Sequence, residues 1–398
     1  MVAASGVHCA DLFSRSNDRV YAPAGENVTA AKACGFAMDN GERHAFEYMR
    51  MISRGQNGGS MYDGTMNRIP LWMSCLVLLA GCATQDIARD AQELLPDPTF
   101  SQWISIRGLG QPWDDGNTKG VFRTTAEQSA APVWRIGQWA SKHSLADPAV
   151  TRQTQLNKHR FLIENPSKRV IVDSRRGEFE LGITASACYD RPRQANEPWP
   201  HLLVETALTD KRYPGASYRV ETMRRLDVAM DCRLTGFKDN HPEGAKPSLH
   251  AAQFQLFLYV QNLNTESPGY GDMLWFGIPI FDNRRPASDE HYQRDGGKPD
   301  ASGKFIYILP TNASQPKGST IFKDGKIVAA PNADWMDIRV DALPWIHRAY
   351  ELARKGGYFP QTEFTDLYVS GLNLGWEMPG IYDATMQVRG FSIRGAAK

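Results

Sequence analysis

The chain has 398 residues, with 45 lysine and arginine side chains against 44 aspartate and glutamate side chains, and a formal net charge of +1. This balance excludes a strong general attraction to phosphate groups, so we expect no nucleic-acid partner. Hydrophobic residues make up 42% of the chain, as in an ordinary globular protein, and the 10 Trp and 14 Tyr side chains suit a core and a sugar-binding surface equally well.

The first 65 residues show neither a helical stripe nor strand alternation, and glycines interrupt residues 55–59. We expect residues 1–65 to be an extension from an upstream start codon, and a genuine cytoplasmic leader is the alternative. Residues 66–81 have the pattern of an export signal, because a short basic start at 66–68 precedes an apolar run. That run is shorter than the ~20 apolar residues that span a bilayer. A signal cut by the ordinary peptidase and a buried apolar helix are the alternatives.

The apolar run ends in Leu79-Ala80-Gly81-Cys82, which resembles the lipobox of bacterial lipoproteins. The resemblance implies cleavage before Cys82 and a lipid joined to its sulfur through a thioether. It also implies a membrane anchor in the bacterial cell envelope, at the outer membrane because Ala83 rather than Asp follows the cysteine. Each buried methylene of an acyl chain contributes about 0.8 kcal/mol, so several chains would hold the protein firmly.

Residues 82–98 are polar and end in a Pro-Asp-Pro sequence, which indicates a tether, and we expect residues 99–398 to form a single β-sandwich domain. Within this domain, residues 99–165 are predicted to lack regular secondary structure. The expected strands are residues 170–172, 178–189, 201–208, 218–232, 252–261, 273–281, 304–309, 319–328, 334–340, 366–374 and 384–393. Alternation of apolar and polar residues in the last strands is typical of an antiparallel sheet with one dry face.

One helix is predicted from Leu343 to Lys355. Asp341 would cap its first turn, Pro344 lies where a missing N–H costs little, and Gly356 would end it. About eleven strands with one late helix predict an all-β fold, namely an antiparallel β-sandwich of jelly-roll type.

Two cysteines, Cys188 and Cys232, lie beyond the proposed lipid site. Disulfides persist in exported proteins, so a bridge between them is one expectation and two buried free thiols are the alternative. No Cys-x-x-Cys pair occurs in the sequence, which argues against a zinc ribbon.

The segment 252–261 carries the clearest candidate surface. Phe254, Leu256, Leu258 and Val260 would face the core, and the opposite face would present Gln253, Gln255, Phe257, Tyr259 and Gln261. Amides can donate to and accept from sugar hydroxyls, and aromatic rings stack on sugar C–H faces, so this pattern favours a sugar-binding cleft. The alternative is a sheet face covered by a loop.

Neighbouring strands offer ionisable groups for the same surface. Arg225 and Asp227 share one strand face, and His201 and Glu205 share another. Paired carboxylates are the usual device for glycoside hydrolysis, so Glu205 and Asp227 are the preferred catalytic pair. A salt bridge between Arg225 and Asp227 is the alternative.

Three further residues are candidates for this site. His250 could act as a base, as in jelly-roll polysaccharide lyases, or be a hydrogen-bonded loop histidine. Trp199 could be a sugar platform or the anchor of its loop, and Glu377 lies in a Gly-Trp-Glu sequence that suggests close backbone approach.

Acidic residues and His291 gather between residues 282 and 295. Their spacing matches no EF-hand loop, so we expect a solvated charged loop and no metal or other cofactor, with calcium as the alternative.

The strand-rich body resembles the concanavalin-like jelly-roll group over residues 165–395, on the basis of residues 224–227, 250–261, Trp275 and 375–393. That group includes lectins, glycan hydrolases and polysaccharide lyases, so the resemblance implies a polysaccharide partner. Trp275 and Glu377 are further substrate-binding candidates. The Glu-x-Asp-x-x-Glu motif of its retaining glucanases is absent, and we transfer no catalytic residue.

These observations predict an envelope lipoprotein that binds glycan, with cleavage by a glycoside hydrolase or lyase mechanism as the stronger form of the hypothesis. A non-catalytic scaffold that contacts proteins or peptidoglycan is the alternative.

Overall fold

The computed structural model describes residues 90–110, 118–125, 131–208, 218–245, 249–295, 302–315 and 319–398. These residues all belong to one compact unit. The expected extension (1–65), the signal (66–81) and the lipid-bearing Cys82 lie outside the described residues.

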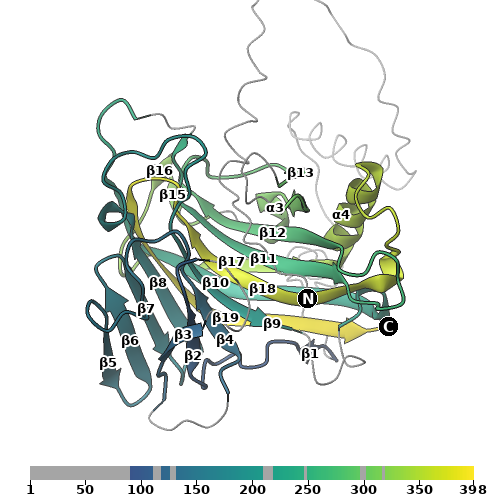
Figure 1. Ribbon diagram of the computed structural model, residues 1–398, viewed down its shortest axis with the longest axis horizontal. Helices are drawn as coiled ribbons and strands as arrows, with labels where there is room; N and C mark the ends of the chain where they lie inside the picture. The colour runs from purple at the N-terminus through teal and green to yellow at the C-terminus, as the bar shows by residue number, and fades with distance from the viewer. Residues whose placement is uncertain are drawn as a thin grey trace, which may run out of the picture. The chain divides into compact units, whose positions relative to one another are not determined.

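Two large sheets form the body (Figure 1). The eight-stranded sheet has the order β17-β10-β19-β8-β7-β6-β5, with β1 also paired to β19. Its strands are β1 (Gln92–Glu93), β5 (Arg152–Asn157), β6 (Arg160–Asn165), β7 (Lys168–Asp173), β8 (Glu178–Thr184), β10 (Met223–Asp239), β17 (Met336–Asp341) and β19 (Tyr382–Ala397).

The nine-stranded sheet has the order β13-β14-β12-β11-β18-β9-β4-β2-β3. Its strands are β2 (Ile104–Arg107), β3 (Thr118–Phe122), β4 (Trp134–Gly137), β9 (His201–Ala207), β11 (Gln253–Asn262), β12 (Met273–Asp282), β13 (His291–Arg294), β14 (Phe305–Ile308) and β18 (Leu367–Glu377). A separate hairpin consists of β15 (Phe322–Lys323) and β16 (Lys326–Ile327).

The fold is an antiparallel β-sandwich of jelly-roll type, as predicted. Antiparallel pairing dominates, although β12 pairs with β14 and β2 pairs with β4 in parallel. The predicted helix is α4 (Leu343–Lys355), and α3 (Thr311–Ser314) adds one short turn that the sequence did not indicate. Three 3₁₀ helices span Ala185–Ala187, Val220–Thr222 and Phe364–Asp366. None of the described helices is long and apolar enough to span a bilayer.

Alternation along the strands builds the core between the sheets. In β11 the side chains of Phe254, Leu256, Leu258 and Val260 are fully buried in one cluster, as predicted. Strand β10 contributes Leu226, Val228, Met230, Cys232 and Leu234 to the same cluster from the opposite sheet. Successive side chains point to opposite faces of a strand, so the residues between these apolar positions must lie on the outer faces.

The helix start differs slightly from expectation. Ala342 rather than Asp341 is the N-cap residue of α4, and Gly356 is the C-cap residue. The Asp341 carboxylate nevertheless accepts hydrogen bonds from the backbone N–H groups of Leu343 and Leu226, each at 3.1 Å. It therefore ties the first turn of the helix to strand β10.

The expectation that residues 99–165 are irregular is wrong, because five strands (β2 to β6) lie in this segment. These strands are short, and β5 is exposed at every position, so neither an apolar run nor alternation marks it in the sequence. The expected tether, residues 82–98, also extends too far along the chain. Gln92 and Glu93 pair with β19, and Leu94 and Leu95 are only 4% exposed, so this stretch is part of the sandwich.

The predicted disulfide does not form, since both Cys188 and Cys232 are free thiols. Cys232 is buried in the middle of β10, between Met336 of β17 and Val388 of β19. Cys188 follows the 3₁₀ helix after β8 and is half-buried. In the sequence both cysteines lie at the ends of strand-like runs. In the structure only Cys232 points into the core.

Trp376 of β18 joins the two sheets directly. Its ring is fully buried against Phe254 and Phe281 at centroid distances of 5.0 and 5.9 Å. Its indole N–H donates to the backbone oxygen of Leu181 in β8, on the other sheet, at 2.8 Å. One side chain thus supplies both apolar contact and a polar link across the core.

We expect Trp376→Phe to lower the free energy of unfolding by about 1–3 kcal/mol, because it removes the indole N–H and leaves the Leu181 oxygen without that donor. Trp376→Ala should cost about 3–5 kcal/mol through the cavity it creates. Denaturant unfolding of the purified variants measures both values. Equal stability of Trp376→Phe and the wild type would contradict a role for the hydrogen bond.

Candidate functional site

The outer face of the nine-stranded sheet collects most of the predicted site residues, and we call it the site face. It consists of the side chains of β4, β9, β18, β11 and β12 that point away from the core. Strand register aligns them in rows across the sheet. Two of these rows are His201–Glu377–Gln253 and Glu205–Asn373–Phe257.

Glu205 of β9 is the more perturbed carboxyl group on this face. Its side chain is only 13% exposed, and its Oε2 lies 3.8 Å from Arg107 Nε. Burial raises the pKa of Glu205 above its ordinary value, although the charges of Arg135, Arg107 and His201 oppose the shift. A carboxyl group in such surroundings can hold a proton at a pH where ordinary carboxyls are ionised.

Gly137 of β4 creates room beside Glu205. A Cβ atom at this position would lie 2.6 Å from the Trp139 ring and 3.3 Å from Glu205 Cδ. Trp139 in turn packs against His201, with ring centroids 4.8 Å apart. The glycine therefore allows an aromatic ring and a carboxyl group to share one side of the site face.

Glu377 of β18 lies among nitrogen-bearing rings. Its Oε2 is 3.4 Å from Trp199 Nε1, which donates to it, and 3.6 Å from His201 Nε2. His201 Nδ1 donates to the Trp199 backbone oxygen at 2.8 Å, because a carbonyl oxygen can only accept. His201 Nε2 therefore points toward the Glu377 carboxyl group.

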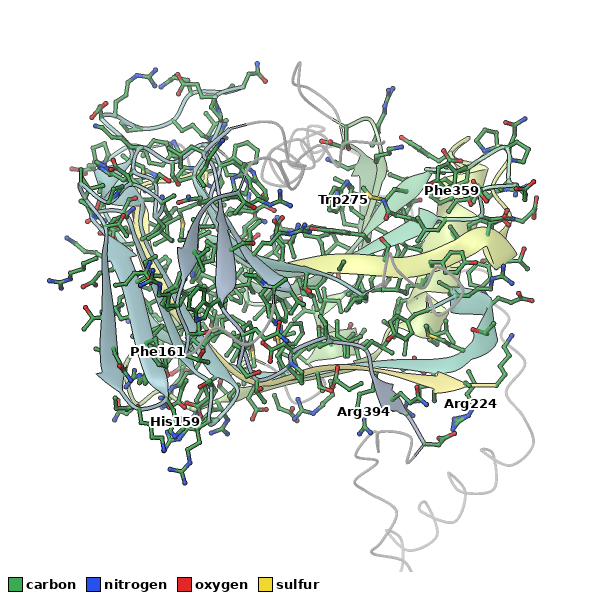
Figure 2. The ribbon with its side chains drawn as sticks, turned by 60° about the horizontal axis from the view of Figure 1, so that its bottom comes forward. His159, Phe161, Arg224, Trp275, Phe359 and Arg394 are labelled. Atoms are coloured by element: carbon green, nitrogen blue, oxygen red, sulfur yellow. The ribbon has the colours of Figure 1, made fainter. Side chains whose placement is uncertain are left out.

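Amides and rings adjoin the two carboxyl groups. Gln255 is 3% exposed, and neither atom of its amide has a hydrogen-bond partner among the described residues. Tyr259 accepts a hydrogen bond from Asn373 at 3.1 Å, and its ring meets that of Trp275 edge-on at 4.9 Å. Figure 2 labels Trp275 on this sheet. A buried amide without partners costs free energy, which a ligand that hydrogen-bonds to it can recover.

Arg225 and Asp227, by contrast, do not belong to this face. They lie on β10 in the eight-stranded sheet and alternate with the core residues Leu226 and Val228. The structure therefore corrects the predicted pairing of Glu205 with Asp227, because the core separates them. Arg225 Nε and Asp227 Oδ1 form a 2.6 Å ion pair instead, which is the alternative interpretation given from the sequence.

His250 also lies off the rows of the site face, in the loop before β11. It is 3% exposed, its Nε2 donates to the Arg193 backbone oxygen at 3.2 Å, and its ring packs on His241 at 4.4 Å. Trp199 is fully buried, as expected of a residue that anchors its loop rather than of a surface platform.

Sequence reasoning missed Arg107, Arg135 and Trp139, all of which adjoin Glu205 or His201. They come from the segment that was expected to be irregular. The only available signal was the short apolar alternation around Trp134 and Ile136, which belong to the core.

The calcium alternative gains no support from the part of the chain that the structure describes, where no group of His, Cys, Asp or Glu side chains is arranged to hold a metal ion. Three of the acidic side chains between 282 and 295 have protein partners instead. Asp282 pairs with Arg284 at 2.6 Å, Glu290 accepts from Tyr307 at 2.6 Å, and Asp295 accepts from Ser302 at 2.7 Å.

Comparison with solved structures returns glycan-hydrolysing enzymes at low similarity. Endoglucanase Cel12A from Rhodothermus marinus matches at 11% identity and a TM-score of 0.33, over 60% of this chain and 92% of that one. The xyloglucanase domain of NopAA from Sinorhizobium fredii matches at 10% identity and 0.29, over 62% and 96%. The family 11 xylanase from Neocallimastix patriciarum matches at 9% identity and 0.29, over 66% and 100%.

No protein-family model and no curated protein matches the chain. The TM-scores are near 0.3, and the jelly-roll fold follows from the order and pairing of the strands.

Glu205→Gln should stabilise the protein at neutral pH. The folded chain holds the Glu205 proton more tightly than the unfolded chain, so ionisation reduces stability as the pH rises from about 4.5 through the raised pKa. Gln avoids this cost. We therefore expect thermal unfolding at pH 7 to shift upward in the variant, and the difference from wild type to vanish near pH 4.

Glu197→Gln is the matched control. Arg191 lowers the pKa of Glu197 to about 2, so the charged form of this carboxyl favours folding above about pH 4.5. Its replacement should give no increase in the unfolding temperature at pH 7. A Glu205→Gln variant that is less stable than wild type at pH 7 would contradict the burial argument.

Proposed function

We propose that this protein binds glycan on the site face and hydrolyses it with Glu205 and Glu377, while a lipid on Cys82 anchors it in the bacterial envelope. One observation carries the catalytic part. A buried carboxyl group, Glu377, and a largely covered one, Glu205, lie on the adjacent strands β18 and β9 of one sheet face, and His201 interacts with both.

The surroundings of the two groups suggest different roles. Burial raises the pKa of Glu205, which suits a general acid that protonates the leaving oxygen of a glycosidic bond. Glu377 receives a hydrogen bond from Trp199 and faces His201, which suits a carboxylate. Glu377 is therefore the base that activates water. Acid and base roles commonly separate in this way when two carboxyls occupy unlike environments.

The register argues for attack by water rather than by the protein. Glu205 pairs with Asn373, four residues from Glu377 along β18, so their Cα atoms lie about 13 Å apart along the strands. Gly375 occupies the row between them and carries no side chain above the sheet. Inverting glycosidases separate their carboxyl groups by about 6.5–9.5 Å, retaining ones by about 5–5.5 Å. With Cα atoms this far apart, the two carboxyl groups can leave room for a water molecule between them, so inversion is the mechanism that we propose.

Substrate contacts come from the remaining site-face residues. Gln253 and Gln255 offer amide groups, and the rings of Tyr259 and Trp275 lie next to them, although Trp275 is only 4% exposed. Gln253 donates to Asp282 at 3.2 Å but its amide oxygen has no partner among the described residues. These residues can form hydrogen bonds and ring contacts with sugar units on both sides of the cleaved bond.

A panel of soluble polysaccharides tests the proposal. We expect new reducing ends of inverted configuration with wild-type protein and a loss of about 10²–10⁴-fold in rate for both Glu205→Gln and Glu377→Gln. Asp227→Asn, a buried carboxylate on the other sheet, is the control and should keep most of the activity.

Retention of full activity by both site-face variants would rule out this assignment of roles. Unsaturated products would indicate a lyase, and binding that Gln255→Ala abolishes, without any product, would indicate a lectin-like protein. Neither binding nor products would favour a scaffold that contacts proteins or peptidoglycan.

Lipidation is tested by Cys82→Ser. We expect the wild-type protein to fractionate with membranes, most strongly with the outer membrane, and to carry the added mass of a lipid. The serine variant should lack that mass and leave the membrane fraction, because no thioether can form. A variant that stays membrane-bound with an unchanged mass would refute the anchor.

A further inference from the structure

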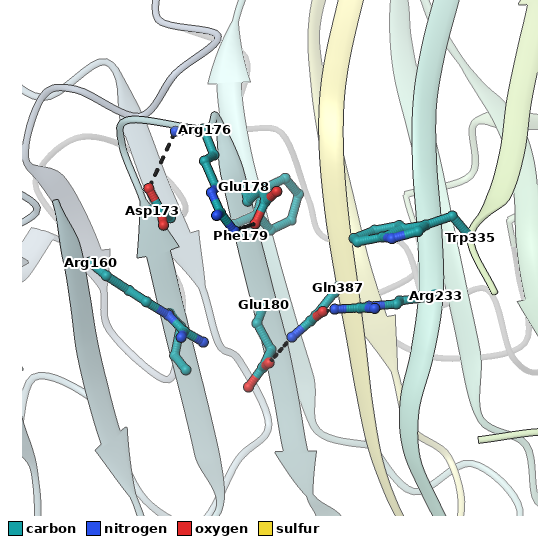
Figure 3. A pocket seen from close by; sticks show the side chains of 10 residues that line it. Arg160, Asp173, Arg176, Glu178, Phe179, Glu180, Arg233, Trp335 and Gln387 are labelled. Carbon is teal, nitrogen blue, oxygen red and sulfur yellow. Dashed lines mark hydrogen bonds and ion pairs between the residues drawn. The ribbon is translucent and has the colours of Figure 1, made fainter. Parts of the chain in front are cut away.

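A second recess lies on the opposite side of the sandwich, on the outer face of the eight-stranded sheet. It is a partly open recess of about 130 Å³, which is room for part of a ligand rather than for a complete one. Side chains of β6, β7, β8, β19 and β10 line it, together with Trp335 (Figure 3). The core separates this recess from Glu205 and Glu377.

Hydrogen bonds order the floor of the recess. Arg233 Nε donates to Gln387 Oε1 at 2.7 Å, and Gln387 Nε2 donates to Glu180 Oε2 at 2.6 Å. Because both ends of the Gln387 amide are used, its orientation is fixed. The three side chains come from neighbouring strands in one row of the sheet, β10, β19 and β8.

Trp335 forms a rigid wall at one end. The guanidinium carbons of Arg233 and Arg389 lie 4.4 and 4.1 Å from its ring centroid. Figure 3 shows the Trp335 ring and the Arg233 guanidinium side by side with parallel planes. Cation–π contacts of this kind hold the arginine in place, so the remaining N–H groups of Arg233 are available in a fixed geometry.

Arg160 marks the other end. It extends from β6 toward the middle of the recess, toward Glu180 (Figure 3). Among the residues that the structure describes, no side chain forms a hydrogen bond or an ion pair with its guanidinium. A guanidinium group has five N–H donors, so this residue can bind a ligand without giving up a protein contact.

The charges around the recess balance. Three guanidinium groups (Arg160, Arg176 and Arg233) face three carboxyl groups (Asp173, Glu178 and Glu180). Neither an anion nor a cation is therefore favoured, whereas an uncharged ligand with many hydroxyl groups can use donors and acceptors together.

We propose that this recess is a second glycan-binding site, which takes a segment of a neutral oligosaccharide chain and acts independently of Glu205 and Glu377. Such a site would hold a polymer on the side of the protein that faces away from the site face.

Isothermal titration of the full-length protein with cellohexaose, xylohexaose and chitohexaose tests this site. At least one of these probes should occupy two sites per chain. Arg160→Ala should weaken one of them about tenfold, since it removes charge-assisted hydrogen bonds. Glu205→Gln should leave that same site unchanged. Arg152→Ala, on the exposed edge strand β5, is the matched control and should change neither site.

Three results would overturn the proposal. The first is identical binding by Arg160→Ala and the wild type. The second is binding of every probe at one site only, or at none. The third is a preference of the Arg160-dependent site for polygalacturonate, because it would show that the ligand is charged. If Glu205→Gln loses catalysis but keeps the Arg160-dependent site, the second glycan-binding site is independent of the proposed catalytic site.

Discussion

The packing of two sheets through one apolar core is the constraint on which the rest of this structure depends. Trp376 shows how closely the sheets are joined, because its indole ring lies among Phe254 and Phe281 and its N–H reaches the backbone of β8. Once the apolar residues of each strand point inward, the intervening residues must point outward. The outer faces therefore receive the residues that a ligand can contact.

The two outer faces use polar residues in different ways. On the nine-stranded sheet, Glu377 is buried and Glu205 is only 13% exposed, and Gln255 lacks partners among the described residues. On the eight-stranded sheet, the Gln387 amide links the Arg233 guanidinium to the Glu180 carboxylate across neighbouring strands. Buried, incompletely satisfied groups cost stability, and such costs are concentrated at functional sites. This difference is the reason why we propose catalysis on the first face and only ligand binding on the second.

Strands with strong alternation were predictable, and strands without it were not. The segments around 252–261 and 336–340 carry apolar residues at every second position, so their inward faces could be read directly. Strand β5 is polar and exposed throughout, and β2 and β4 are only four residues long, so their pairing partners rather than their composition make them strands. The residues that surround Glu205 were missed for this reason.

The sequence alone determined the local features of this protein: the lipobox-like Leu79-Ala80-Gly81-Cys82, the helix from Leu343 to Lys355, the inward face of β11 and the presence of Glu205 and Gln255 on outward faces. Only the tertiary structure decided which strands present their outward side chains on the same sheet face. Glu205 and Glu377 come together because β9 pairs with β18, and Asp227 is removed from them because β10 belongs to the other sheet. Alternation depends on neighbours along the chain, whereas strand order depends on contacts between residues far apart in sequence, which no local pattern encodes.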